Sequence, residues 1–145
     1  MLKAIHKHSH HHGNCDDSVV LSFEQRKKGR LKTVTLQGHE LGLFLERGKV
    51  LRHGDVLETD CGQYILVQAA DEAVAVASTN DWHNFAKLCY HLGNRHTPLE
   101  VGVLEIRFQP DHVLQELCEN FGLQVSLLNT SFNPESGAYG SQHEH

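Results

Sequence analysis

The sequence has no long apolar run and no excess of positive charge. No segment approaches the roughly 20 apolar residues of a membrane-spanning helix, and no apolar signal stretch follows Met1, so we expect no membrane partner and no export. The 13 lysines and arginines face 18 acidic residues, a formal net charge of -5, which argues against nucleic acid. The one basic run, residues 26–30, is expected to be a solvated strand end rather than a phosphate contact.

Paired cysteines and catalytic motifs are also missing. The four cysteines form no C-x-x-C pair, which argues against a zinc ribbon or a disulfide framework and fits a cytoplasmic protein; they are Cys15, Cys61, Cys89 and Cys118. There is no H-E-x-x-H, no G-x-S-x-G and no G-x-x-x-x-G-K-[ST] motif. A catalytic metal site would need about three protein ligands in a sheltered pocket. We therefore expect no enzymatic activity.

Histidine is the abundant residue, with 13 in 145 positions. Seven lie near the ends of the chain: His6, His8, His10, His11, His12, His143 and His145. The N-terminal tract is irregular and runs into Asp16, which favours natural sequence over an expression tag. Short histidine-rich tracts bind borderline divalent metals weakly and release them readily. We expect residues 1–17 and 131–145 to be flexible segments that serve as weak accessory metal ligands.

The region between these ends changes its pattern near residue 70. Residues 18–70 contain short apolar runs separated by glycine turns, and none is periodic enough for a helix, so they predict a small all-β domain. Its expected strands include residues 19–23, which carry the apolar run Val-Val-Leu-Ser-Phe.

Residues 71–130 alternate strands with helices. Asp81 can cap a helix that Gly93 would end in the left-handed conformation, and a second helix would begin at Pro110-Asp111 and end at Gly122. The strands are expected at residues 73–77, 99–101, 103–108 and 123–128. The order βαββαβ predicts a ferredoxin-like domain, so the chain as a whole is expected to be α+β.

One segment, Tyr-His-Leu-Gly-Asn-Arg-His-Thr-Pro-Leu at residues 90–99, resembles the signature of the UreE urease accessory metallochaperones. Further matches occur in the expected order at residues 42–57, 69–70, 111–114 and 132–140. The resemblance spans about residues 18–140. The departure lies in the histidines of the N-terminal tract, because such extensions in this family are usually C-terminal.

The resemblance implies a nickel chaperone that forms a homodimer and delivers Ni(II) to apo-urease through the accessory GTPase. It implies a peptide-binding-like first domain, and a second domain that dimerises and places His96 on the dimer axis as the primary ligand, shared between two copies. A neutral imidazole suits Ni(II), and a histidine near a twofold axis supplies two ligands. His112 resembles a secondary metal position, although a solvated helix residue is an equal alternative. Copper or zinc are alternative metals at these sites.

The remaining histidines receive no metal role. His91 is expected to pack or hydrogen-bond, and His39, His53 and His83 fall at turns or on a helix face. The cysteines are expected in the core or in strands, with Cys15 an accessory ligand candidate beside His12.

Three functions compete: a nickel chaperone for urease, a general histidine-rich buffer for nickel, copper or zinc, and a protein-interaction module of the urease maturation complex. Stoichiometry separates the first two. A chaperone should show one preferred site per dimer that is lost with His96, whereas a buffer should lose capacity only when the ends are removed. Urease activation by the first domain alone would favour the interaction module.

Overall fold

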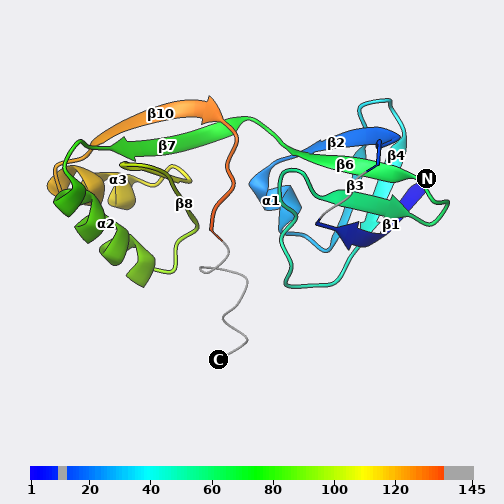
Figure 1. The fold of residues 1–145 in the computed structure, drawn as a ribbon, viewed down its shortest axis with the longest axis horizontal. Helices are drawn as coiled ribbons and strands as arrows, with labels where there is room; N and C mark the ends of the chain where they lie inside the picture. Colours follow the sequence, from blue (N-terminus) through cyan, green and yellow to red (C-terminus); the bar gives the residue numbers. More distant parts are fainter. Residues whose placement is uncertain (10–12, 136–145) are drawn as a thin grey trace. The chain divides into compact units, whose positions relative to one another are not determined.

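The computed structural model describes residues 1–9 and 13–135 (Figure 1). The ligand candidates His10, His11, His12, His143 and His145 lie outside the described residues. The chain divides into two compact units, Met1–Ala70 and Asp71–His145, which we call unit 1 and unit 2. None of the helices in the described part has the length and apolar character needed to cross a bilayer.

Unit 1 is built on a six-stranded sheet with the strand order β2-β6-β5-β1-β4-β3. Its strands are β1 (Leu2–His8), β2 (Asp17–Leu21), β3 (Arg30–Val34), β4 (Glu40–Phe44), β5 (Val56–Thr59) and β6 (Tyr64–Ala69). Strand β1 pairs in parallel with β4 and antiparallel with β5, so it lies in the middle of the sheet. Alternate side chains of the strands point into one apolar core, which includes Ala4, Leu43, Leu57 and Ile65.

The position of β1 corrects the expectation that residues 1–17 are a flexible segment. Residues 2–8 form a strand because Ala4 is fully buried and the backbone pairs on both sides, with β4 and β5. His6 is exposed and His8 is half-buried, and they lie on either side of Lys7, whose ammonium pairs with the buried carboxylate of Asp55. His6 and His8 therefore belong to the folded sheet.

A short helix corrects the all-β expectation for this unit. Helix α1 (Phe23–Arg26) begins at Ser22, whose hydroxyl accepts the N–H of Gln25 while the Gln25 side chain accepts the N–H of Ser22. This reciprocal capping box ends the predicted strand at Leu21. Arg26 is also not solvated as expected, because it is 1% exposed and donates to the carbonyls of Leu21 and Leu51.

Unit 2 combines a four-stranded sheet with two helices, so the chain is α+β, as the sequence predicts. Its elements are β7 (Glu72–Ser78), α2 (Trp82–Asn94), β8 (Leu99–Val101), β9 (Glu105–Phe108), α3 (His112–Asn120) and β10 (Gln124–Thr130). The strand order is β10-β7-β9-β8, and all pairs are antiparallel. Both helices lie on the same side of the sheet (Figure 1). They enclose a core that includes Leu88, Leu92, Phe108 and Leu114.

The helix ends of unit 2 follow the sequence with one exception. Asp81 and Asp111 are the N-caps of α2 and α3, as predicted, and Gly122 has a φ of 84° just after α3. Gly93 lies inside α2, so its predicted left-handed conformation is wrong. The left-handed residue comes three positions later, at His96, with a φ of 54°.

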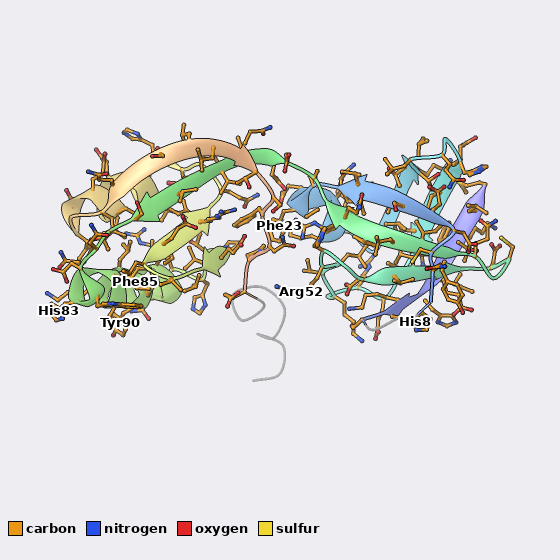
Figure 2. All side chains as sticks on the ribbon, turned by 45° about the horizontal axis from the view of Figure 1, so that its top comes forward. His8, Phe23, Arg52, His83, Phe85 and Tyr90 are labelled. Carbon is orange, nitrogen blue, oxygen red and sulfur yellow. The ribbon has the colours of Figure 1, made fainter. Side chains whose placement is uncertain are left out.

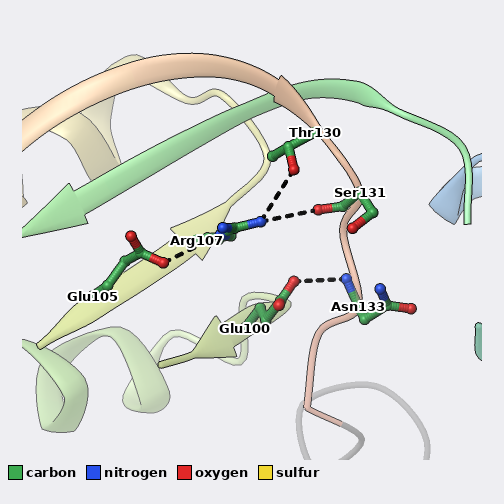
Figure 3. A network of polar contacts seen from close by, with 6 residues as sticks. All are labelled: Glu100, Glu105, Arg107, Thr130, Ser131 and Asn133. Carbon is green, nitrogen blue, oxygen red and sulfur yellow. Dashed lines mark hydrogen bonds and ion pairs between the residues drawn. The ribbon is translucent and has the colours of Figure 1, made fainter. Parts of the chain in front are cut away.

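Residues 131–135 correct the other expected flexible segment. Phe132 is fully buried, and the N–H of Asn133 donates to a carboxylate oxygen of Glu100 at 2.8 Å. The N–H of Glu135 donates to the carbonyl of Leu99 at 2.6 Å. At the end of β10, the side chain of Arg107 donates to the hydroxyl of Thr130 and to the carbonyl of Ser131 (Figure 3). The chain therefore continues in a fixed path along β8 after the last strand.

Candidate metal site

The end of α2 positions His96. Arg95 caps the helix, and its N–H donates to the carbonyls of Gly93 and Leu92. The N–H of His96 also donates to the carbonyl of Gly93, at 3.1 Å. The chain then turns through residues 97 and 98 and enters β8 at Leu99. His96 thus sits in a short loop whose two ends are held by a helix and a strand.

The backbone conformation of His96 is unusual for a residue with a side chain. A φ of 54° lies in the left-handed region, which strains most residues but is visited by histidine more often than by bulky or branched residues. The side chain is exposed. Backbone strain of this kind costs about 1–3 kcal/mol and concentrates at functional sites, so it marks His96 as a candidate.

A shallow groove lies beside this loop. Arg95 and Thr97 line one part of it, and Pro110, Asp111 and Val113 at the start of α3 line another. The carboxylate of Asp111 accepts the N–H of Leu114 at 3.0 Å, so its first role is to cap α3. The loop that carries His96 and the beginning of α3 therefore border the same groove.

His112, the secondary ligand candidate, is the first residue of α3. Its side chain is 86% exposed, and its Nε2 lies 3.9 Å from a carboxylate oxygen of Glu116 one turn later. An imidazole and a carboxylate four residues apart lie on the same face of a helix. Within the described residues, no three side chains of histidine, cysteine, aspartate or glutamate are gathered closely enough to hold a metal ion.

All four histidines without a predicted metal role are exposed, and two of them make side-chain contacts. The ring of His91 packs on Phe121 with centroids 5.0 Å apart, which confirms the predicted packing. Nδ1 of His53 accepts the N–H of Ala69 at 3.0 Å. His83 is exposed near the start of α2, on the same helix as Tyr90 (Figure 2), and His39 is exposed between β3 and β4.

Three of the four cysteines have a raised thiol pKa, whereas Cys61 is exposed in a turn and not in the core or a strand as predicted. Burial raises the pKa of the Cys118 thiol to about 11, and burial likewise raises the pKa of Cys89. Burial and then the nearby Asp16 carboxylate raise the pKa of Cys15, the accessory candidate. Because the thiolate is the metal-binding form, these three groups are poor ligands at neutral pH.

One contact that the sequence did not reveal concerns His8. Nε2 of His8 lies 2.9 Å from Oε1 of Glu58 on the neighbouring strand β5. The residues are 50 positions apart, and only the pairing of β1 with β5 brings them together. Neither residue carries a local sequence signal that predicts this contact.

Comparison with known proteins decides the family. The model of the UreE urease accessory protein N-terminal domain matches residues 1–70, and that of its C-terminal domain matches residues 72–145. The chain belongs to the UreE urease accessory protein family. Membership makes it an accessory protein rather than an enzyme, as the sequence predicts.

Individual UreE proteins match along nearly their whole length. The urease accessory protein UreE of Alteromonas mediterranea is 52% identical over 146 residues, which cover 100% of this chain and 95% of the relative. UreE of Psychromonas ingrahamii is 49% identical over 97% of this chain and 92% of its own. UreE of Marinomonas sp. is 46% identical over 94% and 93%. The UreE family assignment therefore covers both units and the loop that carries His96.

Proposed function

We propose that the chain is a nickel chaperone that binds Ni(II) at His96 and delivers it for assembly of the urease active site. The observation that carries this proposal is the exposed imidazole of His96 on a left-handed residue, in a member of a urease accessory family. Imidazole nitrogen is a suitable donor for Ni(II). Copper and zinc would compete for the same nitrogen.

To deliver its metal, the site must bind the ion but leave some coordination positions without a protein ligand. One imidazole supplies one ligand, so we propose that two copies of the chain form a homodimer and contribute His96 from each to a shared ion. Water and the C-terminal histidines His143 and His145 would fill the remaining positions. Such a site can pass the ion on, because a partner can replace the water ligands one at a time.

Accessory ligands would raise the local supply of metal. We assign His112 as a secondary position, where its exposed imidazole and Glu116 share one face of α3. The end histidines His143 and His145, together with those at positions 6–12, are assigned weak binding. Several weak ligands on one chain increase the effective concentration of metal near the main site.

Three further assignments accompany this function: the fold of unit 2, the location of the chain and the partner that receives the metal. We assign unit 2 to the ferredoxin-like fold, because its element order is βαββαβ and its sheet order is β10-β7-β9-β8. We place the chain in the cytoplasm, where its cysteines stay reduced, and propose the urease complex with its accessory GTPase as the partner that receives nickel.

Urease activation tests this function. Nickel-loaded chain should activate apo-urease in the presence of the other accessory proteins, and the His96→Ala variant should support little activation at limiting nickel. The His83→Ala variant removes another exposed imidazole of unit 2 and serves as the matched control. Full activation by His96→Ala would contradict the proposal and favour a general metal buffer.

A further inference from the structure

A second pair of metal-ligating atoms lies on the sheet of unit 1. Nε2 of His8 and Oε1 of Glu58 are 2.9 Å apart, on the adjacent antiparallel strands β1 and β5. Both side chains are partly exposed, at 41% and 33%, so solvent ions can reach them. Figure 2 labels the His8 side chain on β1.

The strand register gathers further polar groups on the same face. His6 stands directly opposite Glu58 in the strand register, and side chains two positions apart on a strand share a face, so His6 lies on the same face of β1 as His8. Tyr64 pairs with Glu58 from the other side, and its ring centroid lies 6.4 Å from that of His8. The pair is therefore held by three neighbouring strands.

The nearest cation on β1 is occupied elsewhere. Lys7 alternates to the opposite face from His6 and His8, and its ammonium lies 3.6 Å from the buried carboxylate of Asp55. Glu58 thus contacts the imidazole of His8 rather than a lysine. An imidazole nitrogen and a carboxylate oxygen are donors that nickel, copper and zinc all accept.

The separation of the two atoms suits a common metal ion. Two ligand atoms at about 2.1 Å from a metal and at a right angle to each other lie about 2.9–3.0 Å apart. The ion would take the place of the hydrogen between Nε2 and Oε1, while a neutral imidazole keeps its hydrogen on Nδ1. The imidazole must turn so that the Nε2 lone pair points at the ion instead of at Oε1.

We propose that His8 and Glu58 form a two-donor binding site for a divalent transition metal ion on unit 1, with water filling the remaining coordination positions. This site is independent of the one at His96. It also changes the role of His8 from a flexible accessory ligand to a ligand held on a strand.

A nickel titration followed by NMR of the full-length chain tests the site. In a His96→Ala background, paramagnetic Ni(II) should broaden the amide signals of His8, Glu58 and Tyr64 first among those of unit 1. Glu58→Gln preserves the shape of the side chain but replaces the charged donor, and loss of a ligand should weaken binding at least as much as loss of an outer-shell partner, about tenfold or more. His8→Gln should have the larger effect.

Two controls separate this pair from other histidines. His39→Ala removes an exposed imidazole from the same unit and should leave the broadening unchanged. A variant with His10→Ser, His11→Ser and His12→Ser should bind fewer ions in total but keep the broadening at Glu58 and Tyr64. Unchanged affinity in Glu58→Gln, or loss of the broadening in the triple variant, would overturn the proposal.

Discussion

His8 and His96 are both exposed or half-exposed histidines, but the two units hold them in opposite ways. His8 lies in the middle of a sheet, and its imidazole contacts the carboxylate of Glu58. His96 lies in a loop on a left-handed residue that follows a helix. The strand register places a histidine beside a carboxylate within one chain, whereas the loop leaves the imidazole of His96 exposed.

The largest expected effect tests whether the two units are separate. Phe108 is fully buried in the core of unit 2, so Phe108→Ala should lower the free energy of unfolding of that unit by about 3–5 kcal/mol. Amide hydrogen exchange should show lost protection in β7–β10 and unchanged protection in β1 and β5. Val113→Ala, at a 56% exposed position of α3, is the control and should have little effect. Equal loss of hydrogen-exchange protection in both units would contradict their description as separate units.

A smaller effect concerns the pH dependence of stability that Asp17, a buried carboxylate at the start of β2, gives to unit 1. Burial raises the pKa of Asp17, but hydrogen bonds from Thr35 and from the N–H groups of Ser18 and Gln37 outweigh it and lower the pKa. The contribution of the ionised Asp17 carboxylate to the free energy of unfolding is therefore complete above the unfolded pKa of about 3.9. It is lost as pH falls through the lower pKa of the folded state.

Asp17→Asn should accordingly destabilise unit 1 by about 1–2 kcal/mol near neutral pH, because the acceptor loses its charge. The difference from the unmodified chain should shrink at the acid end of urea unfolding curves recorded from about pH 7 to pH 2. The exposed Asp60→Asn serves as the control. A difference that stays constant with pH would show that Asp17 acts through its shape alone.

The smallest effects should have opposite signs at the two histidines. Without metal, His96→Gly should raise the free energy of unfolding by about 1 kcal/mol, because glycine relieves the left-handed strain. His8→Gly should lower it by about 0.5–1 kcal/mol, because glycine removes the side chain that contacts Glu58 and disfavours extended backbone at the end of β1. Urea unfolding of both variants and of His96→Ala checks this, since alanine gives no relief. The same sign at both positions would contradict the structural contrast.

Local sequence signals account for most of unit 2. Asp81, Asp111 and Gly122 mark helix ends by chemistry that acts within a few residues, and the structure confirms all three. Gly93 shows the limit, because a glycine in the last turn can remain helical while the left-handed residue falls at His96. Which of two nearby positions ends a helix depends on the strand that must follow.

Long-range pairing was the part that the sequence could not predict. The histidine content of residues 1–17 suggested a flexible segment, yet the neighbouring strands β4 and β5 fix residues 2–8. Similarly, Asn133 and Glu135 are held by hydrogen bonds to Glu100 and Leu99, more than 30 residues earlier. His96 was identified through the resemblance of residues 90–99 to a family signature, while Glu58 carries no local signal of its own.

Calorimetric titration of the intact chain with Ni(II) tests the central claim most directly. A shared site predicts one tightly bound ion per two chains, and His96→Ala should remove this tight phase while the weaker binding remains. His83→Ala should leave both phases unchanged. A tight phase that persists in His96→Ala, or that takes up one ion per single chain, would contradict the assignment of His96 as the ligand shared between two copies.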